Sequence, residues 1–153
     1  MQILSTLCYL QKDDKTLMLH RVKKKNDYHK GKWNGLGGKF EPGETPEECA
    51  KREIFEESGL KVNSLTLKGF ISFPNFDNKN DWYTFIFTSN DFEGNLIDSP
   101  EGDLAWIENN RIKELNLWPG DKIFLDWIFQ DKFFSAKFFY KNGEFKKYSV
   151  DFY

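Results

Sequence analysis

Residues 38–60 read GKFEPGETPEECAKREIFEESGL, a glycine-rich loop that runs into one short helix rich in acids. Thr45 begins a capping box, and Pro46 stands at the first helical position, where its missing N–H costs nothing. Gly59 is a left-handed stop after the last turn. The stretch therefore predicts a helix over 46–58 with a loop on each side.

The acids of this helix are spaced so that they share one face. Glu53, Glu56 and Glu57 stand at i, i+3 and i+4, where like charges repel by a few tenths of a kcal/mol per pair. Convergent carboxylates beside a loop of backbone carbonyls suit a hard divalent cation such as Mg²⁺. Arg52, four residues before Glu56, can hold that carboxylate by a charge-assisted hydrogen bond. The alternative interpretation is an ordinary solvated acidic face.

The whole stretch fits the pattern G-x5-E-x7-R-E-U-x-E-E-x-G-U, in which U is aliphatic, at every fixed position. The matching residues are Gly38, Glu44, Arg52, Glu53, Ile54, Glu56, Glu57, Gly59 and Leu60. This pattern resembles the signature box of the Nudix hydrolases. The resemblance implies an enzyme that hydrolyses phosphorus-containing anhydrides, with Mg²⁺ as its cofactor and Mn²⁺ as a substitute.

Composition limits the number of domains and the kinds of partner that the chain can have. With 153 residues it is long enough for one domain with a core, and its formal net charge of −2 gives no basic field for nucleic acid. No apolar run approaches the ~20 residues of a membrane span. Cys8 and Cys49 form no metal-type pair and are expected to be reduced thiols of a cytoplasmic protein. We expect a small-molecule substrate, no nucleic acid or membrane partner, and a monomer or weak dimer.

The remaining chain reads as alternating strands and helices. Apolar stretches bounded by turns predict strands at Ile3–Leu10, Thr16–Val22, Thr66–Pro74, Trp82–Ser89, Asp103–Ile107, Ser135–Tyr140 and Phe145–Asp151. Further helices are predicted at Glu108–Leu115 and about 119–130, and Leu60–Leu65 is expected to be a connection. The layout predicts an α/β fold with a mixed sheet and helices on both sides. Such an α/β/α sandwich, one domain over 1–153, also looks like the Nudix fold with its loop-helix-loop.

Other segments resemble one branch of that family, the 8-oxo-dGTP diphosphatases of the MutT and MutX type. They are WNGLGGK at 33–39, WPGD at 118–121, FSAKF at 134–138 and VDFY at 150–153. The resemblance implies that metal is held by Glu53, Glu56, Glu57, the carbonyl of Gly37 and Glu101, with Asp98 and Asp103 as alternatives to Glu101. It also implies that Glu53 is the general base, with Glu101 as its rival, and that Glu44 and Arg52 brace the box.

Substrate contacts follow from the same resemblance. The expected residues are Lys23, Asn34, Leu36, Gly38, Lys39, Trp118 and Asp121. Lys23 is the leading candidate for the phosphates, followed by Lys24 and Lys39. Asn34 is expected to pair with a purine edge, Trp118 to stack on the ring, and Asp121 to accept from ring N–H or amino donors. His29 reads as a loop histidine rather than a catalyst.

The reaction implied is cleavage of a nucleoside triphosphate into a monophosphate and pyrophosphate, with 8-oxo-dGTP favoured, as in nucleotide-pool sanitisation. One departure leaves the base preference open, because mammalian members have two adjacent acids after Trp-Pro and the first is Gly120 here. A different nucleoside-diphosphate-linked substrate, such as a nucleotide sugar or dinucleoside polyphosphate, is an alternative. A non-catalytic ligand sensor is another, which the intact Arg52, Glu53, Glu56 and Glu57 argue against. Removal of pyrophosphate from RNA ends is disfavoured by the near-neutral charge.

Overall fold

The computed structural model describes residues 1–153, which form a mixed sheet with two α-helices and one 3₁₀ helix. The strands are β1 (Gln2–Lys12), β2 (Lys15–His20), β3 (Trp33–Asn34), β4 (Lys61–Phe73), β5 (Asp81–Glu93), β6 (Asp103–Glu108), β7 (Phe134–Lys141) and β8 (Glu144–Phe152). The helices are α1 (Pro46–Ser58), η1 (Asn109–Glu114) and α2 (Pro119–Trp127).

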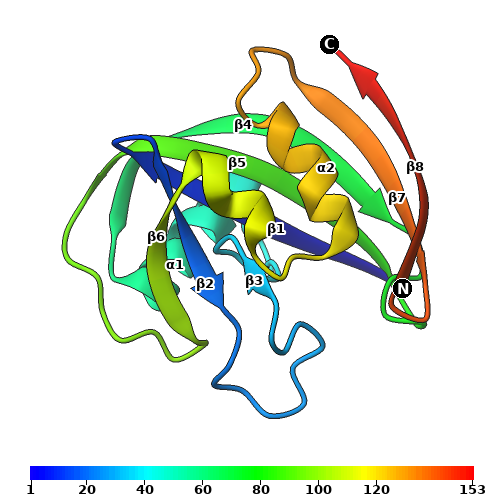
Figure 1. The fold of residues 1–153 in the computed structure, drawn as a ribbon, viewed down its shortest axis with the longest axis horizontal. Helices are drawn as coiled ribbons and strands as arrows, with labels where there is room; N and C mark the ends of the chain where they lie inside the picture. The colour runs from blue at the N-terminus through cyan, green and yellow to red at the C-terminus, as the bar shows by residue number, and fades with distance from the viewer.

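The sheet contains both parallel and antiparallel pairings, and its strand order is β3-β2-β1-β5-β4-β7-β8, with β6 paired to β2. β1 runs parallel to β5, and β4 runs parallel to β7. The hairpins β1–β2 and β7–β8 and the pair β4–β5 are antiparallel (Figure 1). The mixed sheet expected from the sequence is confirmed.

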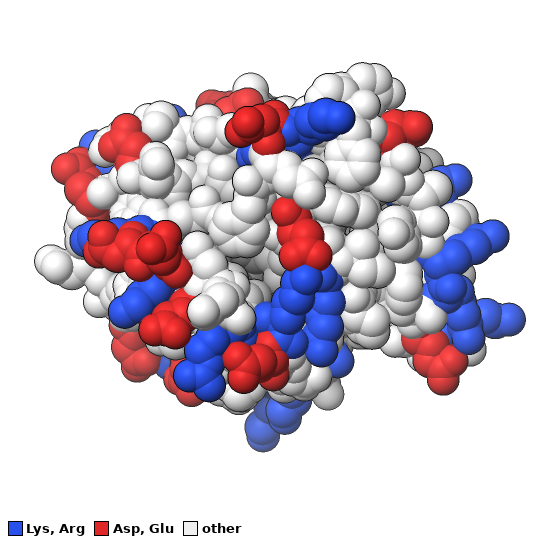
Figure 2. Space-filling view, turned by 45° about the horizontal axis from the view of Figure 1, so that its top comes forward, with Lys and Arg blue, Asp and Glu red and all other residues white.

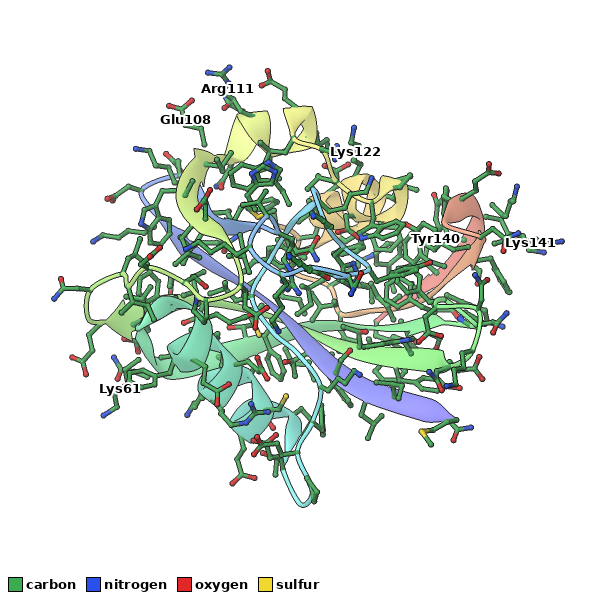
Figure 3. All side chains as sticks on the ribbon, turned by 90° about the horizontal axis from the view of Figure 1, so that it is seen from below. Lys61, Glu108, Arg111, Lys122, Tyr140 and Lys141 are labelled. Atoms are coloured by element: carbon green, nitrogen blue, oxygen red, sulfur yellow. The ribbon has the colours of Figure 1, made fainter.

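Each face of the sheet buries its own core. Along β1, Cys8 and Leu10 pack on the side of α1, whereas Tyr9 between them packs on the side of α2. Successive side chains of a strand point to opposite faces, so a strand covered on both sides is apolar at consecutive positions. Figures 1 and 3 show α1 on one side of the strands and α2 with η1 on the other, which is the predicted sandwich.

Helix α1 has the boundaries that its sequence predicts. Thr45 accepts a hydrogen bond from the Glu48 N–H, and the Glu48 side chain accepts one from the Thr45 N–H, which completes the capping box. Gly59 adopts a left-handed conformation with φ of 80° and donates its N–H to the Phe55 carbonyl. Local chemistry at both ends therefore fixes the position of the carboxylates along the helix.

The prediction for Leu60–Leu65 is wrong, because β4 begins at Lys61 and β5 continues to Glu93 beside it. Polar residues gave this stretch the composition of a loop. Their side chains instead cross-link the two strands, since Asn63 and Ser64 both donate to the Asp91 carboxylate at 3.1 Å. The pairing partner lies far along the chain, which local composition does not reveal.

The surface mixes charges of both signs. Figure 2 shows acidic and basic side chains interspersed over the face in view, without one large field of a single sign. No helix is both long and apolar enough to cross a membrane.

Replacing Thr45 with alanine removes the side chain that caps α1, so we expect the free energy of unfolding to fall by about 1 kcal/mol. Thr45→Ser keeps the hydroxyl and serves as the matched control, with a change below about 0.5 kcal/mol. Urea denaturation of both variants measures the difference. Equal stability of the alanine and serine variants would show that the cap does not hold the helix end.

Candidate active site

Segments far apart in the sequence line one cavity of about 720 Å³. One end of the cavity is formed by α1, the glycine-rich segment before it, and the loop that precedes β6. The other end is formed by the start of α2 and the end of β7, and the loop between β2 and β3 reaches both ends. The first end carries charged groups and the second carries aromatic and amide groups.

The glycine-rich segment lies directly against β1. The Gly38 carbonyl accepts from the Thr6 N–H at 2.9 Å, and Gly37 has φ of +146°. A Cβ on Gly37 would lie 2.1 Å from the Thr6 carbonyl oxygen, and one on Gly38 would lie 2.7 Å from the Glu53 carboxylate. Only glycine fits at position 37, where the clash is with backbone, and a side chain at position 38 would displace the Glu53 carboxylate.

Leu36 is not part of the cavity, which corrects its assignment as a substrate contact. Its side chain is fully buried in the core on the α1 side. Its backbone pairs with Cys8, donating to the Cys8 carbonyl at 2.9 Å. The residue therefore anchors the glycine-rich segment to the sheet.

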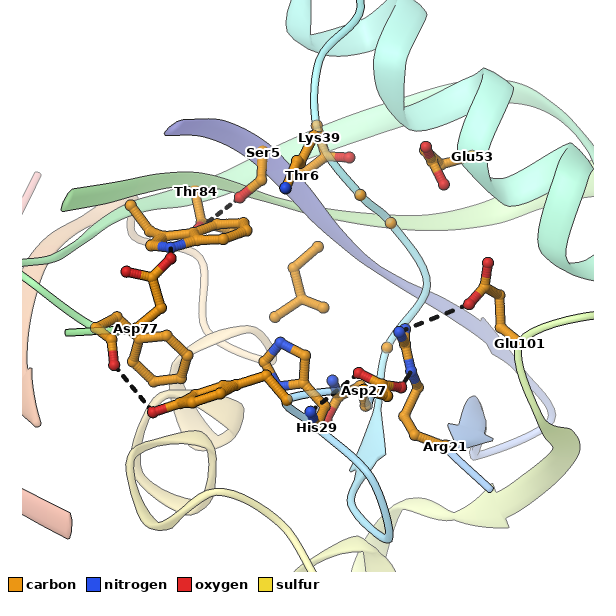
Figure 4. A pocket seen from close by; sticks show the side chains of 18 of the residues that line it. Ser5, Thr6, Arg21, Asp27, His29, Lys39, Glu53, Asp77, Thr84 and Glu101 are labelled. Carbon is orange, nitrogen blue, oxygen red and sulfur yellow. Dashed lines mark hydrogen bonds and ion pairs between the residues drawn. The ribbon is translucent and has the colours of Figure 1, made fainter. Parts of the chain in front are cut away.

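Three carboxylates converge at the charged end. Glu57 is 3% exposed and accepts one hydrogen bond, from the Gly37 N–H at 2.8 Å. Burial, together with the nearby charge of Glu53, raises the pKa of Glu57 to about 8. Burial also raises the pKa of Glu53, to which the charges of Glu56 and Glu101 add. Figure 4 shows Glu53 and Glu101 on the same side of the cavity.

The distant loop contributes Glu101 rather than Asp98 or Asp103. Glu101 lines the cavity, and its Oε2 atom is buried without a hydrogen bond. Asp98 instead forms an ion pair with Lys23 at 2.5 Å, and Asp103 does not line the cavity. Of the three acids considered from the sequence, Glu101 alone faces Glu53 and Glu57.

Glu56 lies apart from this group. Its side chain is 54% exposed and contacts the Arg52 guanidinium at 3.3 Å, outside the cavity lining. As the side chains stand, no three His, Cys, Asp or Glu residues form a cluster able to hold a metal ion. The donor set nevertheless fits a hard divalent cation, because Glu57 is buried and Glu53 half-buried, both with raised pKa values, and the Glu101 Oε2 atom lacks a hydrogen bond.

Arg52 joins the loop to the helix. It binds Glu44 through two hydrogen bonds of 2.7 and 2.9 Å and donates to Glu53 at 2.8 Å. A further bond reaches the Lys39 carbonyl at 3.1 Å. Bonding to Arg52 lowers the pKa of Glu44 to about 2, so Glu44 stays ionised. The guanidinium therefore orients Glu53 rather than facing open space.

The lysines predicted to bind phosphate do not all lie where the prediction placed them. Lys23 donates to Asp98 and to the Ser99 carbonyl and does not line the cavity. Lys24 and Lys39 do line it; Lys24 lies 2.9 Å from Glu101, and Lys39 lies over the Trp82 ring. Of the lysines named from the sequence, Lys24 therefore contacts a cavity carboxylate, whereas Lys39 lines the cavity beside Trp82.

Arg21 is a cavity residue that the sequence did not single out. Its guanidinium lies 2.8 Å from Asp27 and 3.6 Å from Glu101 (Figure 4). The only sequence signal was that Arg21 is one of three arginines in a lysine-rich chain. The ion pairs place a positive charge beside the loop carboxylate.

The other end of the cavity contains Asn34, Trp118 and Asp121, as expected for the base contacts. The Asn34 Oδ1 atom is buried without a partner. The Asp121 side chain is buried, and burial raises its pKa to about 8. Both residues therefore present polar atoms that the protein itself does not satisfy.

Trp118 is held by the loop between β2 and β3. Its indole N–H donates to His29 Nδ1 at 2.7 Å, and the Tyr28 ring stacks on it with centroids 5.6 Å apart. Neither Tyr28 nor His29 was expected here, because no local pattern links this loop to the start of α2. The contact makes His29 a structural partner of the tryptophan.

One cavity thus joins a carboxylate end, suited to a divalent cation, to an aromatic end, suited to a planar ring. The NUDIX domain model matches residues 1–128. The chain therefore belongs to the Nudix hydrolase family.

Several relatives of this chain are known. An oxidized purine nucleoside triphosphate hydrolase of Mus musculus is 36% identical over 121 residues, 79% of this chain and 78% of the relative. An ADP-ribose pyrophosphatase of Methanocaldococcus jannaschii is 37% identical over 120 residues, 78% of this chain and 69% of the relative. The crystal structure of a mutator MutT protein from Bacillus halodurans superposes with a TM-score of 0.88 at 32% identity, covering 97% of both chains.

The contact between His29 and Trp118 predicts a pH-dependent stability. Burial lowers the pKa of His29 from 6.5 to about 4, so the folded protein binds fewer protons than the unfolded chain between these values. The free energy of unfolding therefore falls as the pH drops through this window. His29→Gln keeps an acceptor for the indole but does not titrate. Between pH 6.5 and 4 we expect the free energy of unfolding of this variant to fall by about 2 kcal/mol less than that of the wild type.

Urea denaturation at several pH values between 6.5 and 4 measures this difference. Other acids titrate in both proteins, so only the difference between the two curves reports His29. Parallel curves would show that His29 is not held neutral by its surroundings.

Proposed function

We propose that the protein is a Mg²⁺-dependent nucleoside triphosphate pyrophosphohydrolase that releases a nucleoside monophosphate and pyrophosphate, with 8-oxo-dGTP as its favoured substrate. The observation that carries this proposal is one cavity with carboxylates at one end, and with Trp118 and the unsatisfied amide oxygen of Asn34 at the other. The name of the mouse relative, an oxidized purine nucleoside triphosphate hydrolase, supports the substrate.

Glu53, Glu57 and Glu101, with Glu56 and the carbonyl of Gly37, would hold the Mg²⁺, and Mn²⁺ would substitute for it. The cation, when bound, offsets the charge of the polyphosphate and lowers the pKa of a water molecule. Glu53 accepts a proton from the attacking water, with Glu101 as the alternative base. Arg52 keeps the Glu53 carboxylate in place through its 2.8 Å bond.

Groups of the protein orient the two ends of the substrate. Lys24 at the charged end and Lys39 beside Trp82 both line the cavity, and they neutralise phosphate oxygens. At the other end Asn34 offers a buried carbonyl oxygen to a purine donor, and Trp118 supplies an aromatic surface. The substrate is therefore a small molecule, and the protein needs no extended nucleic-acid surface.

A second candidate is hydrolysis of another nucleoside-diphosphate-linked compound, such as ADP-ribose. One observation favours it: the archaeal relative is an ADP-ribose pyrophosphatase. Both candidates use the same carboxylate end, so they differ in what the aromatic end accepts.

Replacing Glu57 with glutamine tests the charged end. Glutamine keeps an oxygen that accepts the Gly37 N–H, so the fold is retained while the negative charge is lost. We expect kcat to fall on the order of 10²-fold or more, measured as pyrophosphate release with Mg²⁺. Glu47→Gln is the control, because Glu47 is exposed on the same helix outside the cavity. Equal rates in the two variants would refute the role of Glu57.

Initial rates on 8-oxo-dGTP, dGTP, ATP and ADP-ribose at equal concentration separate the two candidates. We expect 8-oxo-dGTP to be cleaved fastest, and Trp118→Ala to lower kcat/KM for it by about 10- to 100-fold, since stacking on an aromatic ring is worth about 1–3 kcal/mol. Trp118→Phe keeps a ring and should lose less. Full activity of Trp118→Ala on the best substrate would favour the second candidate, and no pyrophosphate from any nucleotide would refute the first.

A further inference from the structure

Tyr140, at the end of β7, lies in the cavity although no sequence pattern pointed to it. Its side chain is 6% exposed and belongs to the cavity lining, whereas its neighbour Lys141 points outward into solvent (Figure 3). The ring is fixed by edge-to-face contacts with Phe76 and Trp118, with centroids 5.2 and 5.6 Å away. The phenol is therefore a rigid part of the end that contains Trp118.

The Tyr140 hydroxyl has an unused donor. Its oxygen accepts the Gly120 N–H at 2.7 Å, and the protein offers no acceptor for the O–H itself. Because the N–H occupies the acceptor side of the phenol, the hydroxyl meets a ligand chiefly as a donor. A buried donor without a partner is costly unless a ligand satisfies it.

Gly120 makes room for this hydroxyl. A Cβ at position 120 would lie 2.6 Å from the Tyr140 oxygen and 2.8 Å from a ring carbon of Phe138. A side chain at this position would therefore displace the Tyr140 hydroxyl or the Phe138 ring. The polar group that occupies the space is the phenol of Tyr140.

Asp121 stands beside the phenol. It lines the same cavity, is buried, and accepts no side-chain hydrogen bond from the protein. Burial raises the pKa of Tyr140 well above its usual range, and the charge of Asp121 adds to this, so the phenol stays protonated. A fixed O–H donor and a carboxyl group are therefore adjacent in the cavity.

We propose that Tyr140 is a specificity-determining residue, which donates its O–H to the 6-carbonyl of a 6-oxopurine while Asp121 accepts from the adjacent N1–H. This inference rests on the proposed function and deepens it by naming the purine class. A 6-aminopurine presents the reverse pattern, an amino donor at position 6 and an acceptor at N1, and so leaves the Tyr140 donor unpaired. The hydroxyl thus selects guanine-type and hypoxanthine-type bases over adenine-type bases.

The test compares dITP with dATP, whose bases differ only in the 6-substituent and the N1 proton. Tyr140→Phe removes one oxygen and keeps the ring packing. We expect it to lower the ratio of kcat/KM for dITP over dATP by about tenfold, the effect of one lost hydrogen bond in a buried site. Tyr148→Phe is the matched control, because Tyr148 lies on the partner strand β8 outside the cavity, and its ratio should not change.

A second readout keeps the inference separate from the proposed hydrolysis. Quenching of tryptophan fluorescence by dIMP and by dAMP gives a dissociation constant for each nucleotide. The ratio of the two constants measures the base preference without turnover. If the wild type releases no pyrophosphate but Tyr140→Phe shifts this binding ratio about tenfold, the proposed function fails and the role of Tyr140 stands. An equal loss for both bases, or an unchanged ratio in both assays, would overturn the role of Tyr140.

Discussion

The close approach of the Gly37–Gly38 backbone to the acids of α1 is the constraint on which the site depends. The Gly37 N–H donates to Glu57, and the Gly38 carbonyl accepts from Thr6 of β1. These two bonds tie loop, helix and sheet together at one point. A side chain at Gly37 would collide with the Thr6 carbonyl, and one at Gly38 would collide with Glu53. The carboxylates therefore keep their positions only if both residues are glycine.

Environment, rather than residue type, separates the roles of the glutamates on this segment. Glu44 is ionised because Arg52 binds both of its oxygens, and it serves to brace the loop. Glu57 is buried with a single N–H donor, so its charged form is disfavoured until a positive partner arrives. Arg52 cannot satisfy Glu57 as it does Glu44, because its donors are already directed to Glu44, Glu53 and Lys39.

The sequence could predict those parts of the structure that depend on interactions between residues close together in the chain. The boundaries of α1 follow from a cap, a proline and a glycine that act within one turn. Residues 61–65 could not be predicted as strand, because the register with β5 rests on contacts some 28 residues away, as between Asn63 and Asp91. The same limit explains why Tyr140 was missed, since its position depends on where β7 lies in the sheet.

The loop between β2 and β3 shows why a site cannot be divided into independent ends. Arg21 at its start lies against Glu101 at the charged end, and His29 near its close accepts from Trp118 at the aromatic end. Asp27 lies between them, paired with Arg21 and accepting the His29 backbone N–H at 3.0 Å. Because Asp27 binds both residues, a movement of Arg21 would also move His29, which accepts the hydrogen bond of Trp118. One segment therefore sets the geometry of the charged end and of the aromatic end of the cavity together.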